Sequence, residues 1–259
     1  MCQGKLKKAT IMPSRSRRLS RLTRVVILTL ILVSTTWTAG AREKLATIVI
    51  DPGHGGGDYG NSGPARLVEK DITLAVAKLI VKERKGTYRV VLTRTGDYGL
   101  SLFERTAAAN HQRADLFISL HAGGSTSKQK AGCTIYYFKP ASPGEALSSS
   151  HLPDPESLQD TPTLWSNCQA VHISKSRAAA EAIASRFSKP FISTGSPLKT
   201  TIQGYPLIVL SGADMPALLM EIGYLTNPGE EKNLSTNEYL SEIANRICQG
   251  IDEFFLKKE

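Results

Sequence analysis

The chain has few cysteines, and their spacing is not that of metal ligands. Four cysteines occur in 259 residues, and no pair of them is separated by two residues, so a cysteine-based zinc site is not expected. Three of them lie beyond residue 41, namely Cys133, Cys168 and Cys248. Three cysteines permit at most one internal disulfide and require none.

Acidic residues are absent from the first 41 positions, which carry eight lysines and arginines. The apolar run at 25–33 is shorter than the roughly 20 residues that a membrane span needs. Small residues follow and end in Ala39-Gly40-Ala41, a pattern typical of a cleaved export signal. We therefore expect residues 1–41 to be an export signal and the protein to reach the periplasm or cell envelope. Membrane attachment would require that the signal remain uncleaved.

The positive charge of the chain comes from this segment. The chain has 32 basic and 23 acidic residues, and subtracting the eight cations of residues 1–41 leaves 24 against 23. A nearly neutral remainder gives no reason to expect a nucleic-acid partner. The remaining 259 − 41 = 218 residues suffice for a single domain over 42–259, with no internal repeat and no length for a second binding module.

Strand and helix patterns alternate through residues 42–259 and predict an α/β fold. Apolar runs predict strands at 48–50, 88–93, 115–120, 132–138, 207–210 and 217–223. Helices are predicted from Glu69 to before Gly86, over 101–112, from Thr163 to about Phe187, and after Asn227-Pro228 to the C-terminal end. Residues 139–162, rich in serine and proline, and residues 190–204 are expected to be irregular.

Two histidines each follow a predicted buried strand and are themselves followed by glycines. They are His54, within Gly53-His54-Gly55-Gly56-Gly57, and His121, before Gly123-Gly124. Glu69 lies on the apolar face of its helix, where a carboxylate needs a partner charge or a metal. Each residue alone has a plainer role, as a structural histidine or a helix-capping glutamate. Together they form a set of two nitrogens and one carboxylate that suits zinc with an open fourth position.

A further acid, Glu221, interrupts the last predicted strand. A buried carboxylate is costly unless it has a partner or a function. One interpretation is a salt bridge, to Arg105 for instance. The other is proton transfer: zinc lowers the pKa of water toward roughly 7, and a neighbouring carboxylate takes the proton and passes it to a leaving nitrogen. This second interpretation predicts hydrolysis of an amide.

The motifs around these residues resemble those of a known family. They are IDPGHGG at 50–56, EKD at 69–71, ER at 104–105, AN at 109–110, SLHA at 119–122 and MEIGYLTN at 220–227. As a set they are similar to the zinc-dependent N-acetylmuramoyl-L-alanine amidases of bacterial cell-wall remodelling, over about residues 46–256.

The resemblance implies a fold, a site and a substrate. The fold would be a three-layer α/β/α sandwich around a mostly parallel, mixed sheet of about six strands. His54, Glu69 and His121 would hold Zn²⁺, and Glu221 would be the catalytic glutamate. The substrate would be the amide between N-acetylmuramic acid and L-alanine in peptidoglycan, cut during wall remodelling or daughter-cell separation.

The chain departs from the family pattern at two places. Gly123 stands where members often carry asparagine, and some members hold a regulatory helix in the region of residues 139–162 that a partner protein removes. Here the proline and serine content argues against a stable helix. A separate hypothesis is that the loop covers the site as a lid, with Glu145 or Glu156 reaching inward. Two other functions stay open: a zinc peptidase acting on a stem-peptide bond, and a non-catalytic peptidoglycan-binding protein.

Overall fold

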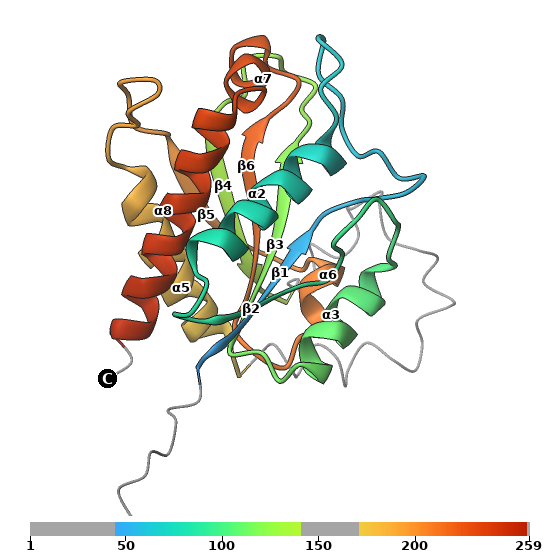
Figure 1. Cartoon of the computed structure of the whole chain (residues 1–259), viewed down its shortest axis with the longest axis vertical. Coiled ribbons are helices and arrows are strands. Elements are labelled where there is room, and N and C mark those ends of the chain that lie inside the picture. The colour runs from blue at the N-terminus through green and yellow to red at the C-terminus, as the bar shows by residue number, and fades with distance from the viewer. Residues whose placement is uncertain (1–44, 141–170, 258–259) are drawn as a thin grey trace, which may run out of the picture. The chain divides into compact units, whose positions relative to one another are not determined.

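A six-stranded sheet forms the centre of the fold (Figure 1). The computed structural model describes residues 45–140 and 171–257. The strands are β1 (Thr47–Pro52), β2 (Arg89–Leu92), β3 (Leu116–Gly123), β4 (Cys133–Phe138), β5 (Thr200–Tyr205) and β6 (Ala217–Tyr224). Their order is β2-β1-β3-β6-β4-β5, and every neighbouring pair is parallel except β4 with β6. The predicted mixed, mostly parallel sheet is confirmed.

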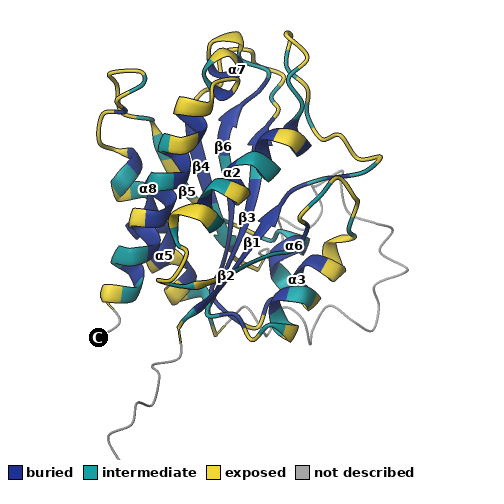
Figure 2. Ribbon diagram, in the orientation of Figure 1, coloured by how far each residue is buried: buried dark blue, intermediate teal, exposed yellow. Residues whose placement is uncertain are grey.

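Helices cover both faces of this sheet and bury it (Figure 2). Helices α2 (Glu69–Glu83), α5 (Ile173–Phe187) and α8 (Asn237–Leu256) lie on one face, and α3 (Leu102–His111) and α6 (Ile208–Ser211) lie on the other. Each face of the sheet has its own hydrophobic core. Successive residues of β1 point to opposite faces, so Ile48 and Ile50 pack in the core under α2, α5 and α8, whereas Val49 packs in the core under α3 and α6. This arrangement is the expected three-layer α/β/α sandwich.

Local signals in the sequence account for several helix boundaries. Ser101 and Glu104 form the predicted capping box at the start of α3. Asn227 caps α7 (Pro228–Leu234) by accepting hydrogen bonds from the backbone of residues 229 and 230. An apolar stripe of α8 is buried, and it includes Leu240, Ile243, Ile247, Ile251 and Phe254.

Two predictions near the end of the chain are wrong. Residues 207–210 were expected to form a strand, but Ile208–Ser211 is a short helix, because a short apolar run does not distinguish a strand from a helical turn. Residues 190–204 were expected to be irregular, yet Thr200–Tyr205 is the edge strand β5. Its polar composition reflects a strand that is exposed on alternate residues.

Other predictions changed in detail or fall outside the described residues. His121 lies within β3 rather than after it, and within the described residues the helix predicted from Thr163 begins at Ile173. The proposed export signal at 1–41, most of the 139–162 loop and Cys168 lie outside the described residues. Cys133 and Cys248 are buried free thiols.

The described residues from Leu45 onward belong to one compact unit. Across residues 45–140 and 171–257, no helix combines the length and apolar character that crossing a membrane requires.

Candidate metal centre

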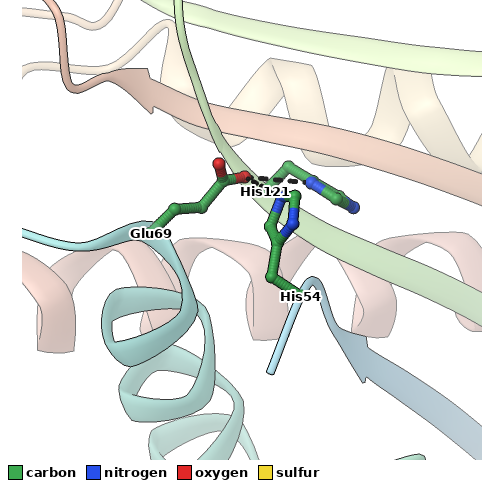
Figure 3. A group of neighbouring side chains, drawn as sticks. All are labelled: His54, Glu69 and His121. Carbon is green, nitrogen blue, oxygen red and sulfur yellow. Dashed lines mark hydrogen bonds and ion pairs between the residues drawn. The ribbon is translucent and has the colours of Figure 1, made fainter. Parts of the chain in front are cut away.

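Three side chains from separate elements meet at one edge of the sheet (Figure 3). His54 lies just after β1, Glu69 opens α2 and His121 lies on β3. One nitrogen or oxygen from each of the three lies within 4.8 Å of the others. The carboxyl ends of parallel strands β1 and β3 share this edge, which explains why residues far apart in sequence come together. The cluster could hold a metal ion.

Glu69 presents one oxygen to both histidines and the other to Asn61. Its Oε1 lies 3.1 Å from His54 Nε2 and 3.0 Å from His121 Nδ1. Its Oε2 accepts hydrogen bonds from the Asn61 backbone nitrogen and side-chain amide, at 2.7 and 2.8 Å. Burial raises the pKa of Glu69, but the hydrogen bonds from His121 and His54 outweigh it, so the pKa lies well below its usual range. The carboxylate is therefore ionised, as a metal ligand must be.

Asp58 orients the first histidine. Its Oδ2 lies 2.8 Å from His54 Nδ1, so the opposite ring nitrogen, Nε2, faces Glu69. Burial lowers the pKa of His54, but the carboxylates of Glu69 and Asp58 outweigh it and raise the pKa above its ordinary value of 6.5. A carboxylate behind the ring of a histidine ligand fixes its tautomer and orientation. The sequence analysis missed this residue, although it lies four positions after His54.

Two glycines allow the ligand side chains to approach the backbone. A Cβ atom on Gly53 would lie 2.7 Å from His121 Nε2. A Cβ atom on Gly60, which has a φ of +66°, would lie 2.6 Å from Glu69 Oε2. No other residue type fits these two positions without displacing the cluster.

Two buried arginines hold the backbone of the loop that carries His54. Arg94 donates from Nε to the Pro52 carbonyl at 2.9 Å and from Nη2 to the Gly53 carbonyl at 2.8 Å. Arg105 donates from Nη2 to the His54 carbonyl at 3.0 Å. His54 itself has a φ of 60°, a left-handed conformation that costs a non-glycine residue roughly 1–2 kcal/mol. These bonds to three consecutive carbonyls stabilise that conformation.

Glu221 lies beside the cluster. It is on β6 and is paired in register with His121 on the neighbouring strand β3. The alternative interpretation, a salt bridge from Glu221 to Arg105, does not hold, because Arg105 pairs with Asp51 at 2.8 Å. Glu221 Oε2 is buried and has no hydrogen-bond partner among the described residues. Burial raises the pKa of Glu221 to about 7. A half-buried carboxyl with one unpartnered oxygen and this pKa is suited to exchanging a proton with a ligand.

Two imidazoles and a carboxylate at strand ends, with a second carboxyl beside them, form the arrangement of a metal-dependent hydrolase. Comparison with known proteins identifies the family. The model of the N-acetylmuramoyl-L-alanine amidase family matches residues 48–253. The chain therefore belongs to this family.

Individual relatives agree with this assignment. The amidase AmiA of Salmonella typhimurium is 31% identical, covering 80% of this chain and 75% of AmiA. AmiC of Escherichia coli O6:H1 is 28% identical over 83% of this chain, which spans 54% of AmiC. The catalytic domain of CwlV, an amidase from Bacillus (Paenibacillus) polymyxa, superimposes with a TM-score of 0.63 at 29% identity, covering 83% of this chain and all of that domain.

Proposed function

We propose that this chain hydrolyses the amide between N-acetylmuramic acid and L-alanine in peptidoglycan, with zinc held by His54, Glu69 and His121. The observation that carries the proposal is the convergence of these three side chains beside Glu221, whose buried Oε2 has no partner among the described residues. Family membership supports the choice of amide.

The donor set fits zinc. Two imidazole nitrogens and one carboxylate are ligands that zinc accepts in catalytic sites, where a fourth position stays open. Glu69 Oε1 lies next to both histidines and also accepts a hydrogen bond from the Ala122 backbone nitrogen at 2.9 Å, while Oε2 is held by Asn61. Oε1 is the candidate ligand atom because it is the oxygen that faces both imidazoles. When bound, zinc would polarise the substrate carbonyl and make water more acidic.

Glu221 supplies proton transfer in this proposal. Its carboxylate takes a proton from the attacking water and delivers it to the nitrogen of L-alanine as the amide breaks. Burial holds its pKa at about 7, so both protonation states are accessible near neutral pH. His54 and His121 would hold the metal and take no part in the transfer.

Digestion of purified peptidoglycan by the full chain tests the proposal, with products read by mass spectrometry. We expect release of stem peptides that begin with L-alanine, lost on chelation and restored by zinc. Cleavage within the stem peptide would point instead to a zinc peptidase. Tight binding without cleavage by zinc-loaded protein would point to a peptidoglycan-binding protein, and either result would contradict the proposal.

Export across the cytoplasmic membrane is part of the same proposal, because peptidoglycan lies outside that membrane. The basic and apolar pattern of residues 1–41 supports an export signal, with 42–259 as the catalytic domain. A protein activator is also proposed. CwlD of Clostridioides difficile, which shares the fold at 22% identity and a TM-score of 0.62, has been solved in complex with the GerS lipoprotein.

A further inference from the structure

A polar pocket of about 420 Å³ lies on the β4–β5 side of the sheet. Its lining includes the side chains of Lys130, Thr134, Lys199, Thr201 and Tyr224. The two lysines are exposed, whereas Thr134 and Tyr224 are 5% and 2% exposed and form the floor. No acidic side chain is among the described residues that line it. The pocket is therefore suited to an anionic or hydrogen-bonding group.

The strand register connects this pocket to the metal centre. His121 on β3 pairs with Glu221 on β6, which pairs with Thr134 on β4, which pairs with Thr201 on β5. Residues paired across neighbouring strands project from the same face of a sheet. A continuous row of side chains thus runs from a candidate metal ligand, through the candidate proton carrier, into the pocket.

Hydrogen bonds and packing organise the floor of the pocket. Thr201 Oγ1 donates to Thr134 Oγ1 at 3.2 Å, and Thr134 Oγ1 lies 2.8 Å from the Tyr224 hydroxyl. Lys130 Nζ lies over the Tyr224 ring, 4.5 Å from its centroid. A Cβ atom on Gly123 would lie 2.6 Å from the Tyr224 ring and 3.0 Å from Glu221 Oε2. Tyr224 therefore lies next to Glu221 and joins the pocket to the site.

We propose that this pocket binds the stem peptide of peptidoglycan, with Lys130 and Lys199 pairing with a carboxylate on the residue that follows L-alanine. The inference rests on the proposed function. There Glu221 protonates the L-alanine nitrogen, so the peptide side of the scissile amide lies on the Glu221 side of the metal. The pocket lies on that side as well.

Distances along the sheet agree with this placement. Neighbouring strands lie about 4.8 Å apart, so β5 is about 10 Å from β6. An extended peptide covers about 3.4 Å per residue, so two or three residues beyond the scissile amide reach the pocket. The glycan strand would then leave the site in the opposite direction, away from β4 and β5.

Equilibrium binding to the zinc-loaded full chain tests the inference without requiring turnover. Two N-acetylated L-alanyl-D-glutamyl peptides serve as probes, each with the side-chain carboxyl capped as a methylamide. They differ in one group, because the main-chain carboxyl is free in one and a carboxamide in the other. We expect wild-type protein to bind the carboxylate about fivefold more tightly in an NMR titration, as for an exposed ion pair.

Matched lysine variants locate the preference. Lys130→Met and Lys199→Met should each reduce the preference toward onefold, whereas Lys82→Met, on the exposed side of α2, should leave it at the wild-type value. Equal binding of the two peptides by wild-type protein, or a preference that survives the Lys130→Met/Lys199→Met double variant, would overturn the inference. A preserved preference in a protein that cuts no peptidoglycan would support the pocket and refute the proposed function.

Discussion

Replacing Arg94 with lysine should weaken zinc binding without contact between the altered side chain and the metal. Arg94 is fully buried and donates to the carbonyls of Pro52, Gly53, Lys70 and Gly96. Lysine keeps the positive charge, but its single nitrogen does not span carbonyls that a guanidinium reaches from three separate nitrogens. The loop that carries His54 then loses part of its support.

The expected size follows from these contacts. Losing one hydrogen bond from a charged donor costs about 1.5–3 kcal/mol of folding free energy, which a domain with a stability of about 5–15 kcal/mol survives. Fixing the backbone of one residue costs about 1–2 kcal/mol. In the variant, zinc binding rather than Arg94 would have to fix the backbone of His54. This cost is subtracted from the binding free energy, so the dissociation constant for zinc rises about tenfold.

Zinc affinity is best measured by competition with a chromophoric chelator, at a temperature where circular dichroism shows the variant to be folded. Arg84→Lys is the matched control, because Arg84 lies at the opposite end of α2 from Glu69 and pairs with Asp252 at 3.0 Å. It should change the melting temperature slightly and leave zinc affinity unchanged. A folded Arg94→Lys protein with wild-type zinc affinity would refute the idea that the guanidinium positions His54.

Three further predictions concern the site and the stability of the fold. Glu221→Gln should lower kcat at least about 100-fold while zinc content measured by mass spectrometry stays at one ion per chain; unchanged turnover would exclude proton transfer by this residue. Gly60→Ala should abolish zinc binding in the chelator assay, whereas Gly57→Ala, whose added Cβ meets no atom within 4 Å, should bind normally; equal affinities would contradict the steric argument. Burial raises the pKa of Glu242, but hydrogen bonds led by that from Arg246 outweigh it and lower the pKa below 4.5. The ionised Glu242 carboxylate therefore stabilises the fold above pH 4.5, and this stabilisation is lost as the pH falls through the folded-state pKa. Glu242→Gln should therefore cost about 1–3 kcal/mol in urea unfolding at pH 7 and less at pH 3, and a cost independent of pH would disprove the ionic contribution.

The central fold could be predicted because its elements carry strong local signals. The buried strand before His54 is a continuous run of β-branched residues, and α3 begins at a complete capping box. The convergence of His54, Glu69 and His121 could also be anticipated, since each lies at a strand end or at the sheet-facing start of a helix. Strand ends of a parallel sheet share an edge, so position along the chain was sufficient.

Other features depend on tertiary contacts that have no periodic signature. Strand β5 is polar because it lies at the edge of the sheet, and its partner β4 is more than 60 residues away in the sequence. The role of Arg94 depends on carbonyl groups, which every residue has, so no side-chain pattern marks them. Arg105 pairs with Asp51 and not with Glu221. This choice could not be predicted, because both acids lie on buried strands and the sequence does not reveal which one the guanidinium reaches.

The single antiparallel pairing in the sheet divides the molecule by task. His54, Glu69 and His121 all come from the parallel half that contains β1 and β3, whereas the pocket is lined mainly by β4, β5 and the residues just before each of them, with Tyr224 of β6. Strand β6, which carries Glu221, lies between the two halves: it pairs in parallel with β3 and antiparallel with β4. On the proposed assignment, grafting β4 and β5 from a relative should change the preference for the peptide and leave the residues that would hold zinc as they are.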